Sequence, residues 1–192
     1  MRNLFYYLIT LLLLQSCASF DKDLTNPYPL NESNLSELDG IYDIKQIDYD
    51  TAFKKFDRQM WTGNNFLQEI DRKLIKDTLH LDSLKNYKFG LKVLNKKRVR
   101  ISYIENDTVF RERTLNAKLK KDGFLYLKNK NTGFLLVPYI AGAIDIKRTR
   151  LSKSENENLI LDYSNHRSGA FLILAFLDGR TWKNRLEYKR IE

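Results

Sequence analysis

The chain of 192 residues contains one cysteine, two histidines and three prolines. A single cysteine cannot form a disulfide within the chain or a CxxC motif for redox chemistry or metal binding. The two histidines, His80 and His166, lie far apart, and neither belongs to an HxH or HExxH pattern. The sequence therefore excludes a scaffold held by internal disulfides, and we expect no metal site.

Sequence motifs of common enzyme classes are also absent. The chain has no P-loop, no Rossmann fingerprint, no EF-hand loop and no G-x-S-x-G nucleophile elbow. In the dense polar segment 165–169, His166 as a base and Ser168 as a nucleophile are one interpretation, and a turn is the simpler one. We therefore expect a non-enzymatic protein without catalytic residues or cofactors.

No apolar run of the chain reaches the roughly 20 residues of a transmembrane helix. The apolar runs 133–144 and 169–177 hold 12 and 9 residues and break the polar–apolar alternation around them. They predict strands that are buried on both faces, with Pro138 and Gly142 marking a bend. The alternative interpretation is the wall of an apolar cavity or a rim that faces a membrane.

The N-terminus has the layout of an export signal. Arg2 precedes the apolar run 4–14, and the small residue Ser16 stands directly before the only cysteine, Cys17. The segment Leu14-Gln15-Ser16-Cys17 resembles a bacterial lipobox. The resemblance implies that residues 1–16 are a signal peptide and that Cys17 becomes the acylated first residue, held in a membrane by its acyl chains. The alternative is an ordinary secretory signal followed by a free cysteine.

The residue after the cysteine bears on the membrane to which such a lipoprotein is sorted. In enteric bacteria an aspartate at this position retains a lipoprotein at the inner membrane, whereas this chain has Ala18. The resemblance therefore implies a place in the cell envelope, at the outer membrane of a Gram-negative bacterium.

The mature chain divides into two parts. Residues 17–37 are rich in Asn, Ser, Glu and Pro and have no apolar period, which predicts a flexible tether behind the acylated cysteine. Residues 38–192 have the size of one domain, and their aromatic residues favour β-strands. We expect a single β-rich domain over that range.

The chain is basic, with a net charge of +9. Its densest basic cluster consists of Lys96, Lys97, Arg98 and Arg100, in a turn that enters an expected strand. Attraction to anionic headgroups or glycans is one interpretation, and a solvated surface is the simpler one because basic residues occur along the whole chain. Nucleic acid is not an expected partner of an exported, membrane-tethered protein.

Polar and apolar residues alternate along segments such as 87–93, 99–103 and 115–119, which places one face of each strand in a core. Turn residues separate the runs at Asn95-Lys96, Asn106-Asp107, Asp122-Gly123, Asn129-Lys130-Asn131 and Asp178-Gly179. Strands joined so closely must be mostly antiparallel. We predict a mainly β fold in which about ten strands form an antiparallel meander, as a barrel or a strongly curled sheet.

One segment has helical periodicity. Tyr49, Phe53, Phe56 and Met60 lie at positions i, i+4, i+7 and i+11, which predicts one short helix near residues 50–61. We expect its aromatic stripe to pack against the sheet, and a lid over a cavity is the alternative.

The start of the expected domain resembles that of a lipocalin-like barrel. In that family a Gly-x-Trp opens the first strand, and a basic residue from a late strand packs over the aromatic ring. Here Gly40-Ile41-Tyr42 corresponds to the first feature, and Arg185 or Arg190 to the second. The resemblance implies binding of an apolar or amphipathic ligand, with ligand-binding residues unassigned. The alternative is a structural or accessory lipoprotein that docks on another envelope protein.

Overall fold

A computed structural model of the chain describes residues 19–20, 24–47, 65–70, 85–129, 132–137, 141–171 and 175–192. Within these ranges, residues 132–137, 141–144, 170–171 and 175–178 are described by their backbone. The described residues form one nine-stranded sheet, the 3₁₀ turn η1 (Leu35–Leu38) and the five-residue helix α3 (Phe66–Ile70).

The strands follow one another in the sheet as an antiparallel meander, in the order β5-β4-β3-β2-β1-β9-β8-β7-β6. Their bounds are β1 Gly40–Gln46, β2 Tyr87–Asn95, β3 Arg98–Glu105, β4 Thr108–Leu119, β5 Leu125–Leu127, β6 Thr132–Val137, β7 Ala141–Lys153, β8 Leu159–Phe171 and β9 Ala175–Arg190. Strand β5 also pairs with β7, so every described strand except β6 belongs to a closed ring.

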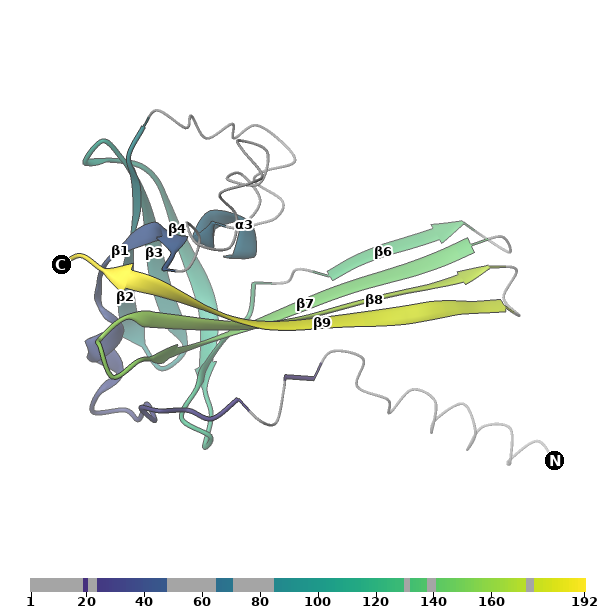
Figure 1. Cartoon of the computed structure of the whole chain (residues 1–192), viewed down its shortest axis with the longest axis horizontal. Helices are drawn as coiled ribbons and strands as arrows, with labels where there is room; N and C mark the ends of the chain where they lie inside the picture. The colour runs from purple at the N-terminus through teal and green to yellow at the C-terminus, as the bar shows by residue number, and fades with distance from the viewer. Residues whose placement is uncertain are drawn as a thin grey trace.

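The long strand β7 serves both the ring and a projection from it. Its residues 149–151 pair with β5, and its residues 141–146 pair with β6 along the same edge. We call β6 together with residues 141–148, 164–171 and 175–183 the arm. Figure 1 shows the arm extending away from the ring, with the C-terminus on the ring's far side.

The structure confirms a mainly antiparallel β fold, with nine described strands where about ten were predicted. Two predicted turns have the backbone that their residues favour. Asn106 and Asp107 both have positive φ, 46° and 64°, in the two-residue turn between β3 and β4. Gly123, with φ 74°, follows β4 and lies so close to Pro29 that a Cβ would stand 2.7 Å from its side chain.

The two apolar runs do not form one strand each. Run 133–144 contributes to both β6 and β7, and run 169–177 contributes to both β8 and β9. Each run is therefore divided between two neighbouring antiparallel strands, which lie in the arm. Alternation fails along these segments, and this removes the signal that would have marked where each strand ends.

The turn predicted at Asp178-Gly179 is wrong, because β9 continues from residue 175 to residue 190. A Cβ on Gly179 would lie 3.1 Å from the ring of His166, so the glycine accommodates that ring within the sheet. The β8–β9 register shifts nearby, between Arg167 and Gly169. Glycine in this strand therefore marks an irregular pairing and a close approach, which is its other common role.

The helix predicted near residues 50–61 lies outside the described residues. The described helix α3 follows that segment, and its Phe66, Leu67 and Ile70 are completely buried. These side chains fill the interior of the ring from one end. Asn65, directly before the helix, forms an isolated antiparallel bridge with Lys45, which lies near the end of β1.

The ring interior is packed with aromatic side chains from several elements. Phe66 stacks on Phe89 of β2 with ring centroids 3.6 Å apart, and both rings meet the edge of Tyr188 of β9, at 5.2 and 5.6 Å. Tyr42 of β1 lies 5.4 Å from Phe89. Burying each such side chain contributes about 1.5–3 kcal/mol, so this cluster is a main source of stability.

The segment that precedes the ring lies against its outer surface. We call residues 19–20 and 24–34 the strap. Tyr28 bridges to Lys153 of β7, and Leu30 donates its backbone N–H to Gly123 O at 2.9 Å. The strap lies within residues 17–37, for which the sequence predicts a flexible tether. The strap itself is bonded to the ring. The domain boundary at residue 38 stays a prediction.

Arg190, near the end of β9, fastens the last strand to the start of the ring. Its guanidinium donates to Glu37 O at 3.2 Å and to Asp39 O at 2.6 Å, the carbonyls around the end of η1. Arg190 is also the β-sheet partner of Tyr42 and lies against Gly40. A charged donor thus satisfies carbonyl groups at a 3₁₀ terminus that would otherwise lack a partner.

We expect Arg190→Ala to lower the free energy of unfolding by about 1.5–3 kcal/mol, because it removes the charged donor from both carbonyls. Urea denaturation followed by circular dichroism measures this difference. Arg180→Ala, an exposed arginine on the same strand, is the matched control and changes stability by less than about 0.5 kcal/mol. Equal losses in the two variants would show that Arg190 does not fasten the ring.

Candidate functional site

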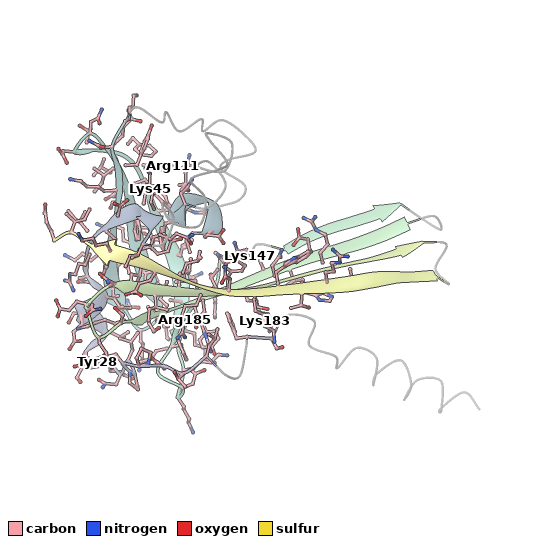
Figure 2. All side chains as sticks on the ribbon, viewed as in Figure 1. Tyr28, Lys45, Arg111, Lys147, Lys183 and Arg185 are labelled. Atoms are coloured by element: carbon pink, nitrogen blue, oxygen red, sulfur yellow. The ribbon has the colours of Figure 1, made fainter. Side chains whose placement is uncertain are left out.

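A buried ion pair lies where the arm joins the ring. Lys147 of β7 pairs with Glu69 of α3, and its side chain is 2% exposed. The Lys147 Nζ also lies 4.4 Å from the centroid of the Tyr163 ring. Figure 2 shows Lys147 at this junction. A buried ammonium needs such close partners, because the desolvation it suffers is otherwise uncompensated.

Asn129 holds the helix to the sheet next to this ion pair. Its Nδ2 donates to Ile70 O at 3.2 Å and to Thr149 Oγ1 at 3.1 Å. Thr149 is two residues from Lys147 on β7, so alternation places both on the same face of that strand. The end of α3, Asn129 and Lys147 therefore surround one buried polar region.

Two tyrosine hydroxyl groups in the ring are buried without a hydrogen-bond partner among the described residues. They belong to Tyr103 of β3 and Tyr188 of β9. Burial raises the pKa of both, and the Glu69 carboxylate raises that of Tyr188 further. Both hydroxyls therefore keep their protons and are available as donors to an oxygen acceptor.

Tyr42 provides a contrast to these two residues. It is just as buried, but its hydroxyl donates to Leu38 O at 2.9 Å. Burial raises its pKa to about 12, and the Arg190 charge acts in the opposite direction. Native proteins pair nearly all buried polar groups, so each unpaired hydroxyl needs an explanation.

We call Lys147, Glu69, Tyr103 and Tyr188, together with Asn129 and Thr149, the junction cluster. It combines the Lys147–Glu69 ion pair with two buried hydroxyls that have no partner among the described residues, and, after burial itself, both Glu69 and Tyr103 raise the pKa of Tyr188. Donors of this kind fit a ligand with a polar, oxygen-rich end. In the part of the chain that the structure describes, no group of three His, Cys, Asp or Glu side chains is placed to hold a metal ion.

A second buried charge cluster fixes the strap. Asp162 of β8 is fully buried and accepts from Arg185 at 2.7 and 3.0 Å and from Arg150 at 2.9 Å. The Arg150 guanidinium lies between the rings of Phe20 and Phe124, 4.5 and 3.6 Å from their centroids. The carboxylate thus shares its charge between two arginines, one of which holds Phe20 of the strap. This pattern is that of a structural ion pair.

Arg185 also reaches the strap directly, through a donated bond to Thr25 O at 3.0 Å. The sequence names Arg185 and Arg190 as alternatives for the basic residue of the lipocalin-like resemblance. The structure places Arg190 beside Gly40 and Tyr42, and it places Arg185 on Asp162. Of the two, Arg190 is therefore the arginine that lies beside Gly40 and Tyr42, and its role as the basic residue of the resemblance stays a prediction.

Charged residues form a band across the base of the arm, which we call the collar. It consists of residues 145–148 of β7, 164–168 of β8 and 178–183 of β9. The collar contains five basic and two acidic residues: Lys147, Arg148, Arg167, Arg180, Lys183, Asp145 and Asp178. Trp182 lies in this band and is 44% exposed, which is unusual for the largest apolar side chain.

The polar segment 165–169 is part of the extended strand β8, so the predicted turn is wrong. His166 Nδ1 shares a 2.8 Å hydrogen bond with Thr181 Oγ1 of β9. Its partner is therefore a neighbouring strand residue, and Ser168 lies further along the same strand. Cys17 and His80 lie outside the described residues.

The basic cluster at residues 96–100 is located, as expected, in a turn and at the start of β3. Lys96 forms an exposed ion pair with Glu32 of the strap at 2.8 Å. Such pairs contribute little to stability in water. A separate surface groove of about 380 Å³ runs beside the strap, lined by Ser19, Phe20, Lys120, Tyr126, Leu127, Arg148 and Thr149.

No family model, curated protein or solved structure matches this chain. Within the described ranges, no helix has the length and apolar character needed to cross a membrane. The candidate site is therefore identified from the contacts, burial and charges of this chain alone.

Tyr188→Phe and Tyr103→Phe are each expected to raise the free energy of unfolding of ligand-free protein by about 1 kcal/mol, because each removes a buried hydroxyl without a partner. Tyr42→Phe is the matched control and is expected to lower it by about 1 kcal/mol, since the bond to Leu38 O is lost. Thermal denaturation of delipidated protein measures these changes. Destabilisation of similar size in all three variants would mean that Tyr103 and Tyr188 have partners.

Proposed function

We propose that the protein is a non-enzymatic lipoprotein of the cell envelope, anchored through Cys17 at the outer membrane, and that it binds an amphipathic ligand. In this proposal the ring is a lipocalin-like barrel. The ligand's polar end is bound by the junction cluster, and its apolar part lies along the adjoining apolar strands of the arm. The observation that carries the proposal is that the buried hydroxyls of Tyr103 and Tyr188 have no hydrogen-bond partner in the part of the chain that the structure describes.

The ring and its fastening support the lipocalin-like part of the proposal. Eight antiparallel strands close the ring, and the first begins with Gly40-Ile41-Tyr42. Arg190 of the last strand is the sheet partner of Tyr42 and donates to the turn before the first strand, a position compatible with the basic residue of the resemblance. The interior around Phe66 and Phe89 is filled by side chains, so the ligand site is assigned to the junction with the arm.

The chemistry of the junction supports an amphipathic ligand. The polar groups of Lys147 and Tyr188 are buried, so a ligand group that bonds to them must leave water and be paired there. From this cluster the strands continue into the runs 133–144 and 169–177, which contain no charged residue. A molecule with one polar end and one apolar end matches this succession.

The strap supports a lipid anchor close to the domain. Ser164 Oγ of β8 donates to Ser19 O at 2.8 Å, so the chain is bonded to the sheet two residues after Cys17. An extended chain covers at most about 7 Å over two residues. An acylated Cys17 would therefore hold the domain directly at the membrane surface.

The alternative function, docking on another envelope protein, is supported by the edges of the arm. Strands β6 and β9 are the outer strands of the four in the arm. Outer strands present backbone groups that can pair with a strand of another protein. In that case the purified protein carries no ligand, and chemical cross-linking in cells captures one envelope protein through β6 or β9.

Native mass spectrometry of the mature protein, extracted from its own envelope in mild detergent, tests ligand binding. We expect a discrete added mass that disappears on organic extraction, because the junction cluster pairs its buried donors with the ligand. Lys147→Met and Tyr188→Phe are expected to reduce the ligand-bound fraction about tenfold. Lys183→Met, an exposed lysine of the same arm, is the matched control and retains the ligand. A bare protein mass for the unmodified chain would contradict the proposal.

Cys17→Ser tests the anchor separately. Cells that express the unmodified chain and are fed an alkyne analogue of palmitate are expected to label the protein, and the Cys17→Ser chain is expected to remain unlabelled. The reason is that the thiol is the acylated group in lipoproteins that the lipobox resembles. Equal labelling of both chains, or of neither, would contradict acylation at Cys17.

A further inference from the structure

The outer part of the arm is uncharged on both of its faces. The described ends of the four arm strands, residues 134–137, 141–144, 169–171 and 175–177, contain no Asp, Glu, Lys or Arg. Cross-strand partners share a face, and the pairs Phe134–Ile144 and Ala141–Phe171 belong to opposite faces by alternation. An apolar sheet of this kind is normally covered by another layer, and Figure 1 shows it projecting from the ring.

The collar at the base of the apolar part has the composition of a membrane interface. Arg180, Lys183 and Trp182 are exposed there, all on β9. Basic residues are attracted to anionic headgroups, and tryptophan favours the depth of the headgroups. Along β7, β8 and β9 the sequence thus passes from apolar to basic residues over a few positions, with Trp182 on β9, as it does where proteins enter a bilayer.

The strap places the proposed anchor at the same level. Ser19 is bonded to Ser164, which is the sheet partner of Lys183 in the collar. Tyr28 of the strap contacts the ring at Lys153, whereas Ser19, nearer the N-terminus, contacts Ser164 at the base of the arm. The strap therefore runs towards the arm as it approaches Cys17. Acyl chains on Cys17 would therefore leave the domain beside the collar, on the side where the arm projects.

The length of the apolar part fits entry into one leaflet. Arg167 in the collar and Phe171 at the end of β8 are four residues apart, or about 13 Å at about 3.3 Å per residue. About 5–7 Å of this length crosses the headgroup layer, which leaves about 6–8 Å in the acyl chains. Within the described ranges, the outer edges of β6 and of β9 in the arm have no strand partner, and their backbone groups oppose deeper entry because hydrocarbon offers them none.

We infer that the end of the arm enters the phospholipid bilayer to which Cys17 is anchored, with the collar among anionic headgroups and the ring outside. The inference rests on the proposed anchor for its orientation, and it does not require a carried ligand. A second copy of the chain would bring two collars of net positive charge together, which is unfavourable. The bilayer is therefore the partner that matches both the apolar end and the collar.

Depth-dependent fluorescence quenching tests this inference on acylated mature protein in vesicles of phosphatidylcholine and phosphatidylglycerol. Trp61→Phe leaves Trp182 as the only tryptophan, because the chain contains two. In that background, Trp182→Phe combined with Phe176→Trp moves the probe to the end of the arm, and Trp182→Phe combined with Leu94→Trp moves it to the ring. With lipids brominated in the upper acyl chain, we expect quenching at position 176 to exceed that at Trp182 about threefold. We expect none at position 94.

Charge reversal in the collar provides the second measurement. Arg180→Glu with Lys183→Glu is expected to reduce quenching at position 176 at least about twofold, because the collar is then repelled by phosphatidylglycerol. Arg98→Glu with Lys118→Glu makes the same change in net charge on exposed residues of the ring and is expected to have no effect. Equal losses in both pairs would show that overall charge, rather than the collar, governs the result.

The outcomes separate this inference from the proposed function. Protein that floats with the vesicles but shows no quenching at position 176 would overturn the inference while the anchor stands. A blue-shifted but unquenched probe at that position would do the same and would show that protein covers the arm. If the protein from cells proves to carry no acyl chains but is still quenched at position 176, insertion of the arm is supported and only the anchor is contradicted. If it is quenched there but has a bare mass in mass spectrometry, insertion is supported and only ligand binding is contradicted.

Discussion

The continuous pairing of β7 with β8 is the constraint on which the rest of the structure depends. The two strands pair residue by residue from Lys153 opposite Leu159 to Ala141 opposite Phe171, without a register shift. A slip by one residue would turn every side chain to the other face, so the buried Asp162 and Lys147 fix this register. Because the same pairing runs through ring and arm, the direction of the arm is set by the packing of the ring.

Buried charges are unfavourable unless they are paired, and here the pairs also position separate segments. Asp162 brings together Arg150 and Arg185, which in turn hold Phe20 and the backbone of Thr25 in the strap. Lys147 and Glu69 join the arm's base to α3 in the same way. Replacing such pairs by apolar residues is often neutral for stability. In this molecule the ion pairs therefore determine which segments lie together. The pairs around Asp162 hold the strap against the ring so that its N-terminal end lies at the collar.

The sequence predicted the parts of the fold whose environment alternates along the chain. Strands β2 and β3, and β4 from residue 115 on, each place one face in the ring, so their pattern was clear. Asn106-Asp107 supplied a turn with the required positive φ. The pattern carried less information where neighbours determine the environment. Gly179 has the residue type of a turn, and only the fold shows that it makes room for the His166 ring. Glu69 and Lys147 are 78 positions apart in the chain, so no local pattern shows that they pair. The contact of Arg190 with Gly40 was not predicted, because the resemblance named Arg185 and Arg190 only as alternatives for a basic residue over the aromatic ring.

Two features of the described residues remain unfavourable without a further molecule. The hydroxyls of Tyr103 and Tyr188 have no partner among the described residues, and the arm extends an uncharged sheet beyond the ring. A phenylalanine would pack equally well at either tyrosine, and charged residues at alternate positions would make the arm soluble, so folding alone explains neither feature. Natural proteins break such rules mainly where another molecule completes the structure. A polar ligand group at the junction would pair the tyrosine hydroxyls, and an apolar medium around the arm would cover its uncharged sheet. A bilayer supplies the apolar medium, and its amphipathic lipids carry polar groups that could reach the junction.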